Sequence, residues 1–276
     1  MTQGWPTLEG DRYDIVEMVG HGAASTVYRA IDRQANHAVA IKVMHPEQMQ
    51  LEAVRRWAQE AEILGSLNHP GIVRVHDTGV CRERSNPYMV MDWIDGETLR
   101  ERVSRGASFE PARVASIVSQ IADAVAAAAE RGVVHRDLKP ENVLLCAPSF
   151  EVVKVVDFGM AKIAERNAPQ LTTDTSKIFG TPQYMSPERA RGDDVGAPAD
   201  VYALGIIAYE LLEGRRPFEG ATPVAILVQH LNAAVPRMLH ASSRVEEVIL
   251  AALAKAPECR PDATMFGRRL ADALID

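Results

Sequence analysis

The stretch at residues 133–145, VVHRDLKPENVLL, constrains most strongly what this chain can fold into. Apolar runs flank a cluster of charged and amide side chains that also contains Pro140, which disfavours a helix. A hydrophobic run that gives way to polar residues and then resumes predicts a strand, a buried loop and a second strand. A solvated turn carrying ordinary charges is the alternative. We favour the buried loop because burying so many polar groups requires partners, and the rest of the chain supplies them.

Composition narrows the class of protein. The chain has 276 residues, of which 47% are hydrophobic and 24% charged, as in folded globular proteins. This length suits one large domain or two lobes that share a cleft. The net charge of −7 offers no basic footprint for nucleic acid. Cys81, Cys146 and Cys259 are far apart and form no C-x-x-C pair, so we predict neither a zinc site nor a disulfide. Free cysteines of this kind suit the reducing environment of the cytoplasm.

No targeting or membrane segment is predicted. The N-terminus has no basic start followed by an apolar run, so it does not resemble a signal peptide. The most apolar helical run, residues 112–129, is interrupted by Arg113, Gln120 and Asp123, and the run at 201–212 is too short to span a bilayer.

The first part of the chain reads as strands. Residues 13–43 contain three β-rich runs, and a glycine-rich hairpin at 20–25 separates the first two. Because this turn joins two strands, it does not fit the dinucleotide fingerprint, which joins a strand to a helix. Its glycines would let backbone N–H groups approach phosphate oxygens, although many hairpins carry a lone G-x-G.

Lys42 lies at the end of an otherwise apolar strand, whose residues Ile41 and Val43 would point to the opposite face. A lysine that extends to solvent is the alternative interpretation. However, a helix is predicted over 47–67, and Glu60 lies beside its apolar face. We therefore predict an ion pair between Lys42 and Glu60.

The rest of the chain is predicted to be mostly helical after a polar, glycine-terminated connector at 91–96. A long helix is expected at 111–131, and residues 152–156 form a strand that leads into Asp157, Phe158 and Gly159. An acid after a buried strand, followed by an aromatic residue and a glycine, suits a metal ligand on a mobile loop. Residues 160–182 have no helical or strand period, which is typical of functional or disordered loops.

Taken together, these motifs resemble the protein kinase catalytic domain over residues 11–272, most closely the bacterial branch of the eukaryotic-like serine/threonine kinases. The segment ARGDDVGAPADVYALG at 190–205 supports that branch. The resemblance implies an α+β bilobal fold. Residues 11–91 would form a β-rich N-lobe with one main helix, 92–96 a hinge and 97–276 a mostly helical C-lobe.

By this resemblance the chain binds ATP. Lys42 would reach the α- and β-phosphates, with Glu60 as its helix partner. Met91 matches the gatekeeper, and Ser25 stands where the family usually has a third glycine. The implied nucleotide-binding residues are Gly20, His21, Gly22, Ala23, Ala24, Ser25, Val27, Ala40, Lys42, Met91, Asp92, Ile94 and Leu144.

The resemblance also assigns the chemistry. Asp137 would accept the proton of the substrate hydroxyl and aim its oxygen, and Lys139 would neutralise charge on the transferred phosphoryl group. Asn142 and Asp157 would hold Mg²⁺, with Mn²⁺ as an alternative, since oxygen ligands suit both metals. Lys139 together with Thr181 indicates serine or threonine as the acceptor.

Further residues have structural or regulatory roles in the family. Leu64, Val75, His135 and Phe158 match a stack of side chains assembled in the active state, and Gly159 follows them. Glu188 and Arg260 match a buried ion pair, and Asp200 falls in the helix-opening motif. Arg136 would bind phosphate on Thr173 and Thr175, which we predict to be autophosphorylated in trans; Thr172 and Ser176 are alternatives.

Expected partners are protein substrates and the kinase itself, not nucleic acid. Arg12 and Asp77 resemble a charge pair at a back-to-back N-lobe dimer interface, although both could be solvated surface residues. We expect a cytoplasmic location, as a complete kinase or as the catalytic part of a longer, membrane-anchored protein.

Two other functions share the fold. A pseudokinase scaffold usually lacks one of the residues that match Lys42, Asp137, Asn142 and Asp157, and all four are present. A small-molecule phosphotransferase generally lacks the S-P-E segment and the long threonine-bearing loop, and both are present here.

Overall fold

The computed structural model describes residues 5–8, 10–22, 24–48, 51–82, 85–158 and 181–275. The chain divides into two compact units. The first comprises Met1–His69 and Val73–Ile94, and the second comprises Pro70–Ile72 and Asp95–Asp276.

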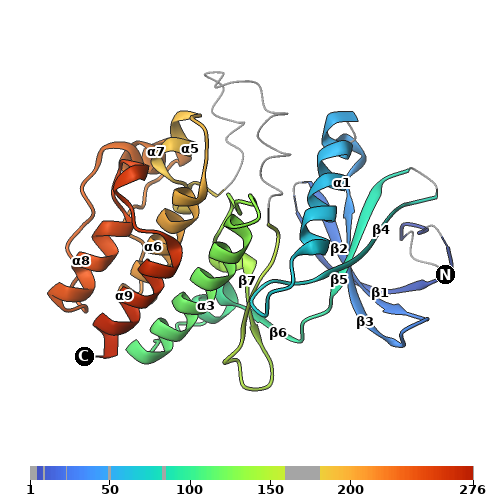
Figure 1. Ribbon diagram of the computed structural model, residues 1–276, viewed down its shortest axis with the longest axis horizontal. Helices are drawn as coiled ribbons and strands as arrows, with labels where there is room; N and C mark the ends of the chain where they lie inside the picture. Colours follow the sequence, from blue (N-terminus) through green and yellow to red (C-terminus); the bar gives the residue numbers. More distant parts are fainter. Residues whose placement is uncertain are drawn as a thin grey trace. The chain divides into compact units, whose positions relative to one another are not determined.

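The first unit is built on a five-stranded antiparallel sheet in the order β1-β2-β3-β5-β4 (Figure 1). Its strands are β1 (Tyr13–His21), β2 (Ser25–Asp32), β3 (His37–Met44), β4 (Val75–Val80) and β5 (Pro87–Asp92). The 3-10 turn η1 (Pro46–Gln48) precedes α1 (Leu51–Ser66), which contacts β4 and β5. The predicted strands and helix are therefore confirmed.

β3 explains how this sheet forms its core. Val39, Ile41 and Val43 alternate along the strand and join one buried hydrophobic cluster with residues of the neighbouring strands. Successive side chains of a strand point to opposite faces, so Ala40 and Lys42 share the other face of the sheet.

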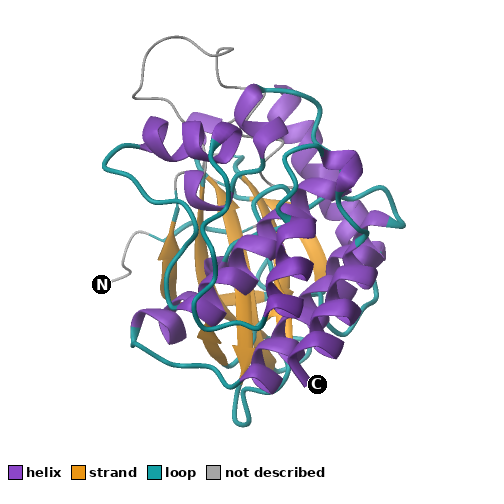
Figure 2. Cartoon of the chain, turned by 90° about the vertical axis from the view of Figure 1, so that its left-hand side faces the viewer, coloured by secondary structure: helices purple, strands orange, loops and turns teal. Residues whose placement is uncertain are grey.

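The second unit contains a small antiparallel sheet and most of the helices, which face the viewer in Figure 2. The sheet has the order β6-β7-β8, with β6 (Gly96–Thr98), β7 (Val143–Cys146) and β8 (Val153–Val155). The helices are α2 (Leu99–Ser104), α3 (Pro111–Ala129), α5 (Pro187–Arg191), α6 (Ala197–Glu213), α7 (Pro223–Asn232), α8 (Ser243–Ala252) and α9 (Ala263–Ile275). Short 3-10 turns lie at η2 (Pro140–Asn142), η4 (Pro182–Tyr184) and η5 (Pro257–Cys259).

Helices α3 and α6 form the core of this unit. Fourteen residues of α6 are buried, as expected from a helix that is apolar nearly all round. α3 contacts both α6 and α9. At the α3–α9 contact, a Cβ on Gly267 would lie 2.9 Å from the Cβ of Ala122, so glycine permits the close approach of the two helices.

Among the described residues, α3 is the one helix long and apolar enough to cross a membrane when length and composition alone are considered, with a mean hydropathy of 1.3 over its most apolar window. Half of that window is buried inside the protein. Helices in the core of soluble proteins pass the same test, so its apolar composition is accounted for by packing in the core.

One predicted strand is wrong. The first of the two strands predicted within 133–145 is absent, because residues 133–138 form an irregular loop. The backbone N–H groups of His135 and Arg136 donate to the carboxylate of Asp200, on α6, and not to a neighbouring strand. The apolar side chains of this stretch are thus compatible with a loop, because a side chain satisfies the backbone.

Candidate functional site

Two residues of the loop between α3 and β7, residues 133–142, meet Thr181, which comes just before η4. Lys139 Nζ donates hydrogen bonds to Asp137 Oδ2 at 2.5 Å and to Thr181 Oγ at 3.1 Å. The side chains of Asp137 and Lys139 are 23% and 18% exposed, so both remain accessible to a ligand. A carboxylate, an ammonium group and a hydroxyl therefore meet at one accessible point.

His135 connects this loop to the strand segment before Asp157. The Asp137 N–H donates to His135 Nδ1 at 3.3 Å, so Nδ1 must accept. The proton then belongs on Nε2, which donates to the carbonyl of Val156 at 2.8 Å. The imidazole is fully buried, and its ring lies 4.7 Å from that of Phe158. His135 thus links the loop to the segment before Asp157.

Asp200 holds the backbone of the loop. Its Oδ2 and Oδ1 accept from the N–H groups of His135 and Arg136 at 2.7 and 2.8 Å. Burial raises the pKa of Asp200, and the two N–H donors act in the opposite direction. Arg136 has φ 68°, a left-handed conformation that costs energy in a non-glycine residue. The buried carboxylate stabilises this conformation.

Asn142 and Asp157 lie on adjoining segments. Asn142 Nδ2 donates to the backbone carbonyl of Asp137 at 2.8 Å, and the backbone carbonyl of Asn142 accepts from the Val156 N–H at 3.0 Å. Because Nδ2 is the donor, Oδ1 is the atom of this amide that can ligate a metal. Asp157 follows Val156 with φ 65°.

This pair fits a hard divalent cation. An amide oxygen and a carboxylate are ligands that Mg²⁺ prefers, and Mg²⁺ usually completes its shell with water and phosphate oxygens. Among the described residues there is no group of three or more histidine, cysteine, aspartate or glutamate side chains that could hold a metal ion. The donor set therefore suits a metal brought in with a phosphate ligand.

Glu188 and Arg260 form a buried bidentate pair, with hydrogen bonds of 2.7 and 2.8 Å. Arg260 also donates to the carbonyl oxygens of Ala254 and Pro198. Burial alone raises the pKa of Glu188, but the hydrogen bonds from Arg260 hold it below its ordinary value. The pair fixes α5 to the loop that precedes α9.

In the first unit, the glycine-rich turn joins β1 to β2. Gly20 pairs with Val27 and His21 with Thr26, while the Gly22 N–H donates to the Ser25 carbonyl at 2.9 Å. The His45 N–H donates to the Ala24 carbonyl at 2.9 Å. The turn is thus tied to the segment after β3.

The sequence did not predict a side-chain link beneath this turn. Thr26 Oγ lies 2.9 Å from His21 Nδ1 and 2.8 Å from His45 Nε2, and the two imidazole rings stack at 4.7 Å. His21 and Thr26 are cross-strand neighbours once residues 20–25 are read as a hairpin, so that part of the link could have been found. His45 comes from another element and could not.

Of the residues expected around the base of a nucleotide, Val27 lies on β2, Ala40 on β3, and Met91 and Asp92 on β5. Val27 pairs with Lys42, and Ala40 pairs with Met91. Lys42 is only 5% exposed. Asp92 ends β5, where its carboxylate contacts His76 at 2.6 Å, and Ile94 closes the first unit. Leu144 belongs to β7 of the second unit.

Several predicted residues cannot be placed. The following lie outside the described part of the chain: Ala23, Gly159, Thr172, Thr173, Thr175 and Ser176, and the side chain of Glu60. The Lys42–Glu60 ion pair and the phosphorylation sites therefore stay predictions. Leu64 and Val75, expected to stack with His135 and Phe158, are buried in the first unit.

Arg12 and Asp77 are engaged within the chain. Arg12 forms hydrogen bonds of 2.7 and 3.1 Å with Asp32 and one of 3.1 Å with Asp77. Asp77 also accepts from the Tyr13 hydroxyl at 2.8 Å. An intramolecular role thus accounts for both side chains, and the dimer stays a prediction.

Two groups of contacts were missed because their members are far apart in the sequence. Arg100 donates to Glu141 at 2.9 Å and to Glu210 at 3.0 Å, and the Tyr184 hydroxyl also donates to Glu210. Arg189 Nη1 donates to the carbonyl of Arg136 and lies 3.6 Å from Asp137 Oδ1.

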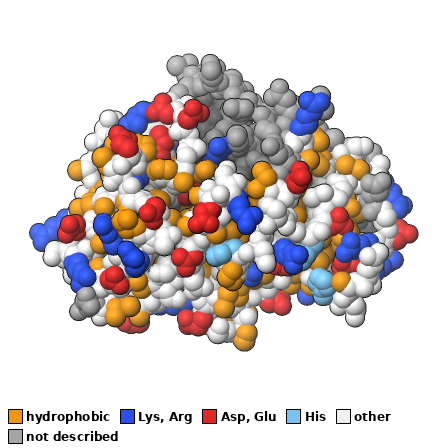
Figure 3. All heavy atoms as spheres, viewed as in Figure 1, with side chains coloured by type: hydrophobic (Ala, Val, Ile, Leu, Met, Phe, Trp, Pro, Cys, Tyr) orange, Lys and Arg blue, Asp and Glu red, His pale blue; other side chains and the backbone are white. Residues whose placement is uncertain are grey.

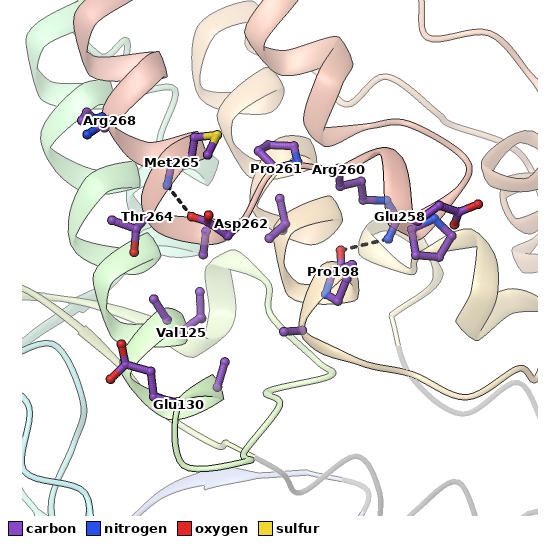
Figure 4. Close-up of a pocket in the computed structure, with 16 residues that line it drawn as sticks. Val125, Glu130, Pro198, Glu258, Arg260, Pro261, Asp262, Thr264, Met265 and Arg268 are labelled. Carbon is purple, nitrogen blue, oxygen red and sulfur yellow. Dashed lines mark hydrogen bonds between the residues drawn. The ribbon is translucent and has the colours of Figure 1, made fainter.

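A cavity of about 700 Å³ lies elsewhere in the second unit, between α3, α6, η5 and α9 (Figure 4). Val125, Pro198, Pro261 and Met265 supply part of its apolar wall, and Glu130 lies at its edge. None of the residues that gather around Asp137 lines it. On the face of the molecule in Figure 3, charges of both signs are interspersed over the described residues.

Comparison with known proteins assigns this chain to a family. The protein kinase domain matches residues 13–268. The serine/threonine-protein kinase PknB of Mycobacterium tuberculosis (strain ATCC 25177 / H37Ra) is 38% identical over 262 residues, which cover 92% of this chain and 41% of the relative. The probable serine/threonine-protein kinase SCO3848 of Streptomyces coelicolor is 37% identical, covering 92% and 38%.

A solved structure agrees. The crystal structure of Rad53 1-466 in complex with AMP-PNP superposes with a TM-score of 0.76 at 27% identity, covering 95% of this chain and 64% of that one. The chain spans about two fifths of the length of the PknB relatives it matches. From these matches and the two-unit architecture, the chain belongs to the protein kinase family, in the group of the bacterial serine/threonine-protein kinases.

Proposed function

We propose that this chain is the catalytic domain of an ATP-dependent serine/threonine protein kinase, which transfers the γ-phosphoryl group of ATP to serine or threonine hydroxyls of protein substrates. The observation that carries the proposal is the junction of Asp137 and Lys139, on an accessible loop of a protein kinase domain, with Thr181. This junction contains no activated nucleophile, which suits direct phosphoryl transfer.

Asp137 orients the substrate hydroxyl and accepts its proton as the oxygen attacks phosphorus. Lys139 turns its ammonium group toward the transferred phosphoryl group, while Thr181 keeps the lysine beside Asp137. Asn142 Oδ1 and the Asp157 carboxylate would hold Mg²⁺, which neutralises phosphate charge when bound; Mn²⁺ is the alternative. Placement and charge neutralisation supply the catalysis.

The resemblance to protein kinases also assigns the residues that would bind the nucleotide. Backbone N–H groups of the turn at 20–25 would cover the phosphates, with Lys42 held toward them by Glu60. Val27, Ala40 and Leu144 would enclose the adenine, and the backbone of Asp92 and Ile94 would read its edge. In this proposal residues 11–91 form the N-lobe, 92–96 the hinge and 97–276 the C-lobe.

Regulation would act through Arg136. Its Nε is buried without a hydrogen-bond partner among the described residues, which supports a role in binding an anion. We propose that phosphate on Thr173 and Thr175, added by another copy of the kinase, is that anion. The proposal fails if mass spectrometry finds an active, purified enzyme unmodified at both threonines. The site of action would be the cytoplasm.

The test is phosphoryl transfer from radiolabelled ATP, with Mg²⁺, to casein and to the protein itself. Asp137→Asn keeps the size of the side chain but removes the base, and should lower kcat by about 10³-fold. Asp123→Asn, on the exposed face of α3, is the matched control and should retain wild-type activity. Wild-type protein that binds ATP but labels no protein would contradict the proposal and point to a pseudokinase.

A further inference from the structure

We infer that Arg189 is a positioning residue for phosphoryl transfer, which holds the carboxylate of Asp137 while Lys139 turns to the phosphate. This inference rests on the proposed kinase function. Arg189 lies on the short helix α5, 52 positions beyond Asp137 in the sequence, and the motifs of the loop do not point to it.

Arg189 is a buried charge with a defined place. Its side chain is only 7% exposed, and a buried guanidinium requires partners. Nη1 donates to the carbonyl of Arg136 and also lies 3.6 Å from Asp137 Oδ1. The same nitrogen therefore contacts the backbone of the loop and approaches its carboxylate.

The backbone contact is placed where the loop is strained. Arg136 has φ 68°, and its N–H already donates to Asp200 on α6. Its carbonyl is held by Arg189 on α5. The donor and the acceptor of this one residue are thus both fixed by buried charges, which leaves the peptide before Asp137 little freedom to rotate.

The carboxylate of Asp137 has a cation beside each oxygen. Lys139 lies 2.5 Å from Oδ2, and Arg189 lies 3.6 Å from Oδ1. Lys139 is the more exposed of the two, at 18%, and sits on a loop, so it can move toward a phosphoryl group. Arg189 is anchored by α5, which the Glu188–Arg260 pair fixes in turn.

These contacts divide the work between the two cations. When Lys139 turns to the phosphate, Asp137 loses its closest partner, and a free carboxylate would rotate away from the hydroxyl. Arg189 keeps Oδ1 in place, so Oδ2 remains directed at the substrate. Errors of about 1 Å in such placement can cost roughly 100-fold in rate, so loss of this contact should lower kcat.

The experiment compares Arg189→Met, Arg189→Lys and Arg191→Met. Arg191 lies on the same helix, but its side chain is 45% exposed and pairs only loosely with Asp193, at 3.9 Å, so it controls for loss of a charge on α5. For each protein, kcat and KM for casein and ATP, the Kd for a fluorescent ATP analogue and the Tm are measured.

We expect Arg189→Met to lower kcat by roughly 10- to 100-fold, per molecule competent to bind the nucleotide, with little change in the KM for ATP. Arg189→Lys keeps the charge and a donor and should recover part of the loss. Arg191→Met should match the wild type.

Three results would overturn the inference: an unchanged kcat in Arg189→Met, equal losses in the Met and Lys variants, or a loss that vanishes once kcat is divided by the fraction of protein that binds nucleotide. Each requires an active wild type. An inactive wild type would instead contradict the proposed kinase function, so the two failures are distinguishable.

Discussion

The loop at residues 133–142 is held by buried charged groups from distant parts of the chain, whereas the glycine-rich turn at 20–25 is held by its own hairpin and by hydrogen bonds to His45, just after β3. Asp200 on α6 and Arg189 on α5 form hydrogen bonds with the backbone of the loop. The turn has strand pairing and a hydroxyl between two imidazoles, one of them exposed.

The difference matches what each segment would have to do. A group that aims a hydroxyl at phosphorus must be fixed within a fraction of an ångström, so its supports should be stiff and costly to remove. A turn that covers phosphates must admit and release a nucleotide, so weaker supports suffice. The comparison predicts large effects in the second unit and small ones in the first.

The largest effect on stability is expected at the Glu188–Arg260 pair, which fixes α5 and hence Arg189. Arg260→Met leaves Glu188 buried without its cation and should lower the free energy of unfolding by about 4 kcal/mol. Chemical denaturation measures this, with the exposed Arg268→Met as control. The double change of Glu188 and Arg260 to Met should be less harmful than Arg260→Met alone; equal harm would contradict this reasoning.

The next largest effect on stability is expected for Asp200→Asn. An amide offers one oxygen to two backbone donors, so one of the N–H groups of His135 and Arg136 is left buried and unpaired. We expect the free energy of unfolding to fall by about 3 kcal/mol. We also expect kcat to fall further than it does in other variants that have the same loss of Tm. Asp123→Asn is the control. A stable, fully active Asp200→Asn protein would remove the contrast between the two loops.

His230 makes the second unit sensitive to acid. Burial, and then the charge of Lys255, lower the pKa of this imidazole to about 4. The unfolded chain takes up this proton near pH 6.5 and the folded protein only near pH 4, so between these values the unfolded state binds more protons. The unfolding free energy should therefore fall as pH decreases from 6.5 to 4, by at most about 3 kcal/mol.

His230→Phe should flatten this pH dependence, as measured by denaturation at pH values between 4 and 7. The exposed His37→Gln is the control and should leave the slope unchanged. An identical slope in wild type and His230→Phe would show that other groups govern the acid sensitivity.

The smallest effect is expected at Thr26, where Val removes the hydroxyl between His21 and His45 at nearly constant volume. We predict a destabilisation of about 1 kcal/mol and a few-fold increase in the KM for ATP, without a large change in kcat. Thr78→Val, exposed on β4, is the control. A large fall in kcat would mean that the glycine-rich turn is as tightly constrained as the loop at 133–142.

Much of the fold was predictable because its signals are local. The alternation of β3 placed Ile41 and Val43 in the core and Lys42 on the other face, and the nearly all-round apolar composition of α6 is that of a buried helix. Residues 133–138 were wrongly expected to form a strand, because apolar composition does not reveal that Asp200, 65 positions away from His135, satisfies their N–H groups.

By itself, the sequence determined the two-unit kinase architecture and the identity of the candidate residues at 135–142 and 157, since their types and spacing are properties of the chain. Only the tertiary structure decided how they are held: Asp200 on the strained backbone of Arg136, Arg189 beside Asp137, and His45 against Thr26. These contacts join separate elements, and helix packing and strand register, not spacing along the chain, bring their atoms together.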